Sequence, residues 1–88
     1  MQAAKLPGMA RKKSKPYSPD AVKLGKAIRR RREALKVSQD VFADMAGMHR
    51  SYAGFVERGH QNLTLDTMTR IAAALKVPVS TLLKEAGL

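Results

Sequence analysis

The chain has 88 residues and no cysteine, so disulfide bonds and thiolate metal sites are excluded. No apolar run approaches the length of a membrane span, and the first residues lack the apolar segment of a signal peptide. Acidic residues are missing from residues 1–19, although the formal net charge is +10. We therefore expect one small, soluble, cytoplasmic domain with little room for a second site.

The positive charge is concentrated in the first 37 residues. Residues 1–19 carry five basic side chains, and residues 20–37 carry seven basic and two acidic ones. Residues 38–88 balance five basic against five acidic side chains. Such a field attracts polyanions, which include DNA, RNA and anionic membrane surfaces, and charge alone does not choose among them.

The apolar pattern predicts an all-α, five-helix bundle without strands or internal repeats. Residues 1–17 are predicted to form a flexible basic arm, and residues 18–88 a single domain. Ser18, Ser38 and Thr64 are expected to cap helices. The helices are expected over about 19–36, 39–46, 50–58, 65–75 and from residue 79 onward, the fourth with Leu65 in its inner stripe.

The segment QDVFADMAGMHRSYAGFVER, residues 39–58, predicts two short helices joined by a tight turn. Gly47 stands at the corner, where only glycine adopts a left-handed backbone without a steric penalty. The second helix, about 50–57, exposes polar and basic residues on one side. Two helices so joined form a helix-turn-helix, whose second helix enters the major groove of DNA.

Over about residues 22–84 the chain resembles the Cro/repressor-type (XRE-like) helix-turn-helix proteins. This group includes lambdoid phage repressors and restriction-modification controller proteins. The resemblance is carried by Ser38-Gln39, Ala43, Gly47, Glu57-Arg58-Gly59 and the segment NLTLDT…IAAAL. It implies a lambda-repressor-like domain that binds DNA specifically as a symmetric homodimer and catalyses no reaction.

The resemblance also implies roles for individual residues. Gln39 matches a glutamine that bonds a phosphate and braces the recognition helix. Arg32 and Glu57 match an ion pair that ties the first helix to the end of the recognition helix. The positions that meet base edges are His49, Arg50, Ser51 and Phe55. The positions that touch backbone phosphates are Arg58, His60, Gln61 and Asn62.

The residue types allow alternatives at several of these positions. Arg50 could be a solvated surface arginine, but its place at the start of the second helix favours bidentate pairing to guanine. Phe55 is expected to be exposed, because Ala53 and Val56 occupy the inward side, and to contact a thymine methyl group or a deoxyribose. Tyr52 either packs its ring on the bundle or reaches a phosphate with its hydroxyl group.

Other contacts are expected outside the recognition helix. The basic arm is expected to contact phosphates through Arg11, Lys12 and Lys13. Asp40 and Asp44 lie one helical turn apart. In one interpretation, Asp40 interacts favourably with the helix dipole and Asp44 has no specific role. In the other, both contact RNA polymerase, as acids at these positions do in the resembling phage repressor.

The remaining residues bear on metals and on self-association. His49 and His60 have no nearby cysteine or convergent acid, so we expect no metal and no cofactor. A monomer of this size hardly buries all of its C-terminal leucines. The dimer interface is therefore predicted to include Leu82, Leu83 and Leu88.

The sequence thus predicts a homodimeric transcriptional regulator, and not an enzyme, that binds a pseudo-palindromic operator and acts as a repressor or autoregulator. An antitoxin-type protein that binds a toxin and controls its own promoter would use the same fold. A non-specific nucleic-acid or membrane-surface binder would use only the arm and the first helix.

Overall fold

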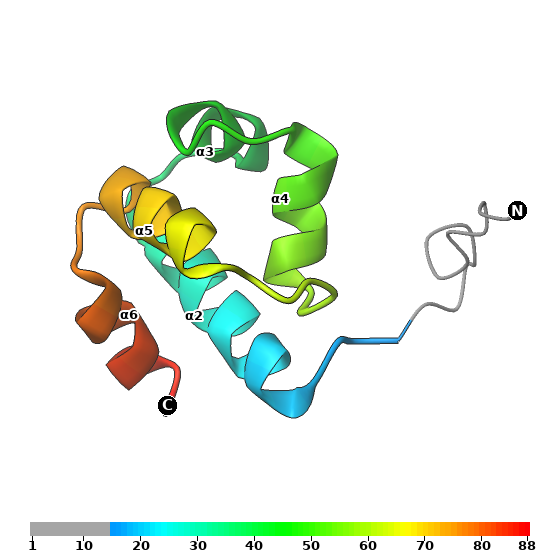
Figure 1. Ribbon diagram of the computed structural model, residues 1–88. Coiled ribbons are helices and arrows are strands. Elements are labelled where there is room, and N and C mark those ends of the chain that lie inside the picture. The colour runs from blue at the N-terminus through cyan, green and yellow to red at the C-terminus, as the bar shows by residue number, and fades with distance from the viewer. Residues whose placement is uncertain (1–14) are drawn as a thin grey trace, which may run out of the picture.

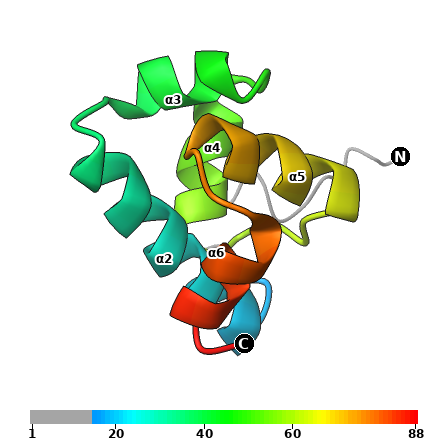
Figure 2. The same cartoon turned by 90° about the vertical axis from the view of Figure 1, so that its left-hand side faces the viewer.

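The computed structural model describes residues 15–88, which form five helices and no strand (Figures 1 and 2). The helices are α2 (Pro19–Ala34), α3 (Gln39–Met45), α4 (Arg50–Glu57), α5 (Leu65–Ala74) and α6 (Val79–Glu85). The predicted all-α, five-helix fold is therefore confirmed. Within residues 15–88, no helix combines the length and the apolar character that a membrane crossing requires.

Four of the five helices begin at a side chain that accepts a hydrogen bond from a backbone N–H of the first turn. Ser18, Ser38 and Thr64 do so for α2, α3 and α5, as predicted from the sequence. At the start of α4 this acceptor is His49, whose Nδ1 lies 3.2 Å from the backbone nitrogen of Ser51. The sequence placed His49 only as a DNA contact, because histidine is not a typical cap.

Several helices end one or two residues earlier than predicted, and α2 ends at Ala34 rather than near Lys36. Lys36 and Lys76 follow the ends of α2 and α5 with φ values of 61° and 63°. A left-handed backbone at a lysine cannot continue the helix, so the chain turns there. Gly47 has φ of 69°, as its corner position requires.

One core receives side chains from all five helices. Ile28, Phe42, Ala53, Ile71 and Leu82, one from each helix in order, are all 0% exposed. α2 packs against both α4 and α6, α3 packs against α4, and α5 packs against α6. The two views show α4 and α6 on opposite sides of the protein (Figures 1 and 2).

Two leucines lie where the sequence did not place them. Leu65 was expected in the inner stripe of the fourth helix, but it is 69% exposed at the start of α5. Leu82 was expected at the dimer interface, but α6 folds back onto α2 and buries it completely. The buried side chain of Leu82 therefore cannot contact a second subunit. Leu83 is half-buried and Leu88 is 50% exposed, so both remain accessible.

The segment before α2 is attached to the end of α4. The backbone N–H of Tyr17 donates to the carbonyl oxygen of Gly59 over 2.7 Å. A Cβ atom on Gly59 would lie 2.6 Å from the Cα of Val22, so only glycine fits between these segments. The predicted arm contacts Arg11, Lys12 and Lys13 lie outside the described residues.

Candidate nucleic-acid interface

α4 buries one side and exposes the other. Ala53 and Val56 are buried in the core, whereas Arg50, Ser51 and Arg58 are exposed. The helix has eight residues, and it is exposed both at its start, at Arg50 and Ser51, and at its C-cap, Arg58. A short helix presented in this way has the dimensions that enter a major groove, which is about 12 Å wide.

Phe55 was expected to be exposed, but it is half-buried, and the side chain of Arg58 lies over its ring. The Arg58 Cζ atom lies 5.1 Å from the centroid of the ring. A guanidinium over an aromatic face is attracted by the negative charge density of the ring. Phe55 therefore holds Arg58 near the surface at the end of α4.

Two other residues of this region have structural contacts of their own. The half-buried ring of Tyr52 packs against the core. His49 Nδ1 lies 2.8 Å from the Ser51 Oγ in addition to capping the helix. His49 and Ser51 are thus held together at the exposed start of α4.

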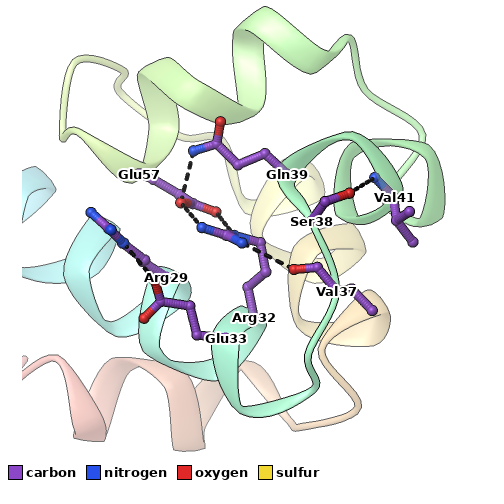
Figure 3. A network of polar contacts seen from close by, with 8 residues as sticks. All are labelled: Arg29, Arg32, Glu33, Val37, Ser38, Gln39, Val41 and Glu57. Atoms are coloured by element: carbon purple, nitrogen blue, oxygen red, sulfur yellow. Dashed lines mark hydrogen bonds and ion pairs between the residues drawn. The ribbon is translucent and has the colours of Figure 1, made fainter.

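A polar network ties the end of α4 to α2 and α3 (Figure 3). The Nε of Arg32 donates to Oε2 of Glu57 over 2.6 Å, and its Nη2 donates to Oε1 over 3.0 Å. Their side chains are only 11% and 3% exposed. The hydrogen bond to Glu57 raises the pKa of the Arg32 guanidinium.

Two further bonds complete this network. Nη1 of Arg32 donates to the carbonyl oxygen of Val37 over 3.0 Å. Nε2 of Gln39 donates to Oε1 of Glu57 over 3.0 Å. Arg32, Gln39 and Glu57 thus join three helices through one buried carboxylate, which fixes the angle of α4 (Figure 3).

A second ion pair lies at the other end of α4. Nε of Arg50 is 3.1 Å from Oδ1 of Asp40, and both side chains are exposed. The sequence treated these residues separately, Arg50 as a base contact and Asp40 as a helix-dipole or polymerase residue. Only the folded arrangement of α3 and α4 brings them together. Asp44, one turn further along α3, is also exposed.

Arg70 of α5 braces the turn between α3 and α4. Its Nη1 donates to the carbonyl oxygen of Gly47 over 3.2 Å, and its Nε lies 3.6 Å from Oδ2 of Asp66. The sequence did not indicate this contact, because 23 residues separate Arg70 from Gly47. The turn is consequently supported from outside the helix-turn-helix itself.

The residues at the end of α4 and in the following loop that are expected to contact phosphates differ in their exposure. Arg58 and Asn62 are exposed, whereas His60 and Gln61 are half-buried. Gln61 and Asn62 line a hollow that also includes Tyr17. Among residues 15–88, no group of three metal-ligating side chains comes together.

Comparison with known proteins agrees with this geometry. A helix-turn-helix family model matches residues 28–82. Control protein C.SmaI from Serratia marcescens is 40% identical over 65 residues, which cover 74% of this chain and 77% of that protein. The crystal structure of the restriction-modification controller protein C.AhdI from Aeromonas hydrophila is 38% identical with a TM-score of 0.72, over 74% of this chain and 98% of that one.

A regulator from another system has the same fold. The clp gene regulator ClgR from Corynebacterium glutamicum is 25% identical with a TM-score of 0.77, over 82% of this chain and 92% of that one. The family match spans more than half of the chain, and C.SmaI is a close relative over most of its own length. The chain therefore belongs to the helix-turn-helix family of DNA-binding transcription regulators and is related to restriction-modification controller proteins.

Proposed function

We propose that the protein binds a pseudo-palindromic operator as a homodimer and acts as a repressor or autoregulator. The observation that carries this proposal is the outward side of α4, where Arg50, Ser51 and Arg58 are exposed while Ala53 and Val56 anchor the helix. Two such helices, about 34 Å apart, would enter successive major grooves on one side of the duplex. The protein would act in the cytoplasm, by binding and without catalysis.

The side chains of α4 divide into base and phosphate contacts in this proposal. Arg50 pairs with guanine, and His49 and Ser51 lie beside it at the base edges. Arg58 reaches a phosphate from its position over Phe55, which also faces a thymine methyl group or sugar. Phosphates are further contacted by Gln39, Tyr52, His60, Gln61 and Asn62.

Gln39 is suited to both of its proposed roles. A carboxamide nitrogen carries two protons, and the bond to Glu57 uses one of them. The second proton is then available for a phosphate. The same side chain would thus brace α4 and contact a phosphate of the DNA backbone.

The basic arm is proposed to follow the duplex from the end of α4. The bond from Tyr17 to Gly59 supports this, because it places the C-terminal end of the arm, where it joins α2, beside the end of the recognition helix. Deleting residues 1–15 removes five basic side chains, including Arg11, Lys12 and Lys13. The slope of log affinity against log salt should fall by about 0.9 for every phosphate that the arm neutralises in the intact protein. An unchanged slope would refute the arm's role.

Self-association is proposed to involve Leu83, Leu88 and the exposed Leu65 rather than Leu82. Leu65 and Leu88 are among the large apolar side chains that the monomer leaves exposed. Replacing Leu65 or Leu88 with aspartate should shift the protein toward monomers in sedimentation velocity. A variant that sediments as the wild type would remove that leucine from the interface.

Control of restriction-modification genes is the regulatory role that the controller relatives favour. Asp44 is proposed to contact RNA polymerase when the operator lies just upstream of a promoter. Asp40 could join it, although its carboxylate is already paired with Arg50. Transcription from a reconstituted promoter by Asp44→Asn, at equal operator occupancy, tests this contact.

Selection of bound sites from random duplex DNA, followed by footprinting, tests the central proposal. The expected result is an inverted repeat whose half-sites are one helical turn apart. The Arg50→Ala variant should lose discrimination at one base pair of each half-site. Selection that enriches no sequence would contradict specific binding.

A further inference from the structure

We propose that Asp40 determines the specificity with which Arg50 reads DNA. Its carboxylate holds the guanidinium so that two N–H groups face the bases, and it disfavours contacts of the same guanidinium with phosphates. Because Arg50 is assigned to bases under the proposed function, this role of Asp40 rests on that function. Asp40 is thus a positioning residue, which acts on the DNA through Arg50.

The position of the pair supports this role. Asp40 lies in the first turn of α3, and Arg50 is the first residue of α4. Their 3.1 Å contact bridges the two helices at the exposed start of the recognition helix. The preceding residue, Gln39, bonds to Glu57 at the other end of α4. Neighbouring residues of α3 therefore hold side chains at both ends of α4.

The geometry of the contact leaves the useful donors of Arg50 available. The guanidinium has five N–H groups, and its Nε carries only one of them. Asp40 contacts this Nε. The two Nη atoms keep their donors and form a planar edge, which fits the O6 and N7 acceptors of guanine.

The charge of Asp40 also disfavours the wrong contact. An exposed arginine without a partner samples many rotamers, and any rotamer that reaches a phosphate helps binding to every sequence. If Arg50 turned to a phosphate, the pair would have to break, or the Asp40 carboxylate would approach a second anion. Either event weakens binding to random DNA more than binding to the operator.

Asp44 provides a matched control for the charge. It lies on the same helix, it is exposed, and it is not among the ion-paired side chains found within residues 15–88. Asp44→Asn therefore makes the same change in net charge as Asp40→Asn without touching Arg50. A difference in DNA affinity between the two variants is therefore due to the Asp40–Arg50 pair and not to the change in net charge.

The experiment measures the dissociation constants of the full-length dimer for the selected operator and for random duplex over a range of salt concentrations. Asp40→Asn should lower the ratio of operator affinity to random affinity about tenfold, which is the discrimination that one base contact provides. Its slope against salt on random DNA should steepen by about 0.9, because Arg50 then binds a phosphate. Asp44→Asn should change both affinities by a similar factor and leave the ratio unchanged.

Three results would overturn the inference. The first is equal ratios for the two asparagine variants. The second is a lower ratio for Asp40→Asn in an Arg50→Ala background, since Asp40 would then act through another group. The third is a much lower ratio of operator affinity to random affinity for Asp40→Glu than for the wild type, because this variant keeps the carboxylate. Thermal unfolding of each variant verifies that the fold is intact.

Failure of the proposed function gives a different result. Arg50→Ala would then keep the wild-type ratio, or selection would yield no operator at all. Either result removes the base contact of Arg50 and, with it, the role of Asp40. An operator that depends on Arg50 but not on Asp40 overturns only the inference.

Discussion

Gly25 of α2 lies directly against the backbone of Glu57 at the end of α4. A Cβ atom at residue 25 would lie 2.6 Å from the carbonyl oxygens of both Val56 and Glu57. These atoms belong to a helix and cannot rotate away as a flexible side chain would. The close contact of α2 with the recognition helix therefore requires a residue without a side chain.

Gly25→Ala should destabilise the protein by about 1–3 kcal/mol, because α2 and α4 must separate to admit the methyl group. Gly54→Ala is the matched control in α4. Its Cβ would meet nothing closer than the Arg58 Nη1 at 3.4 Å, and alanine favours a helix over glycine by up to about 1 kcal/mol. Urea unfolding should give opposite signs for the two variants, and the same sign would contradict this account of the helix contact.

Phe55→Leu should weaken operator binding several-fold, because leucine keeps the apolar volume but loses the attraction for Arg58. An exposed cation–π contact contributes about 0.5–1 kcal/mol. Phe55→Tyr keeps an aromatic ring and should bind nearly as the wild type does. If leucine binds as well as tyrosine in fluorescence anisotropy, an apolar contact with thymine or sugar explains Phe55 better than the support of Arg58.

Glu57→Ala should destabilise the protein by about 3–5 kcal/mol, because it leaves the Arg32 guanidinium nearly buried and without its partner. Arg32→Ala should cost a similar amount for the reciprocal reason. The double variant Arg32→Met, Glu57→Leu should be less destabilised than either single alanine variant, since no lone charge remains. Additive losses in thermal unfolding would show that the two residues act independently.

The pair between Arg31 and Glu85 should make stability depend on pH. The hydrogen bond from Arg31, with Nε 2.8 Å from Oε1, lowers the pKa of Glu85 below its usual value of 4.5. The folded protein therefore binds fewer protons at Glu85 than the unfolded chain. The stabilisation is present above pH 4.5 and disappears as the pH falls through the lower folded pKa.

Thermal unfolding between about pH 6 and pH 2.5 measures this dependence. Glu85→Gln should flatten the acid side of the profile, and Arg31→Met should do the same because it removes the donor. The effect should be modest, since both side chains are at the surface and salt screens them. Profiles of the variants that parallel the wild type would exclude the pair as a source of acid sensitivity.

Local signals accounted for most of the helices. Ser18, Ser38 and Thr64 cap helices in the structure because a short oxygen side chain and the next N–H groups are close in any chain that turns there. Gly47 marked the corner for an equally local reason, its positive φ. Leu65 was misplaced, since helical spacing alone does not tell which residue at the start of a helix reaches the core.

The long-range contacts of the site could not be obtained in the same way. The contact of Arg70 with Gly47 spans 23 residues, and the Asp40–Arg50 pair depends on the crossing angle of α3 and α4. Burial of Leu82 likewise depends on the return of α6 onto α2. No periodicity or spacing in the sequence carries that information.

An all-α chain, a helix-turn-helix near its middle and a surplus of positive charge in the first 37 residues could all be predicted from the amino-acid sequence. These properties follow from side-chain chemistry, glycine conformation and helical periodicity, which act over a few neighbouring residues. The contacts between particular residues became visible only in the folded protein: Asp40 with Arg50, Phe55 with Arg58, and Gly25 with the backbone of Glu57. Such pairings arise only when helices pack at definite angles, because the packing sets distances between residues that the chain itself leaves independent.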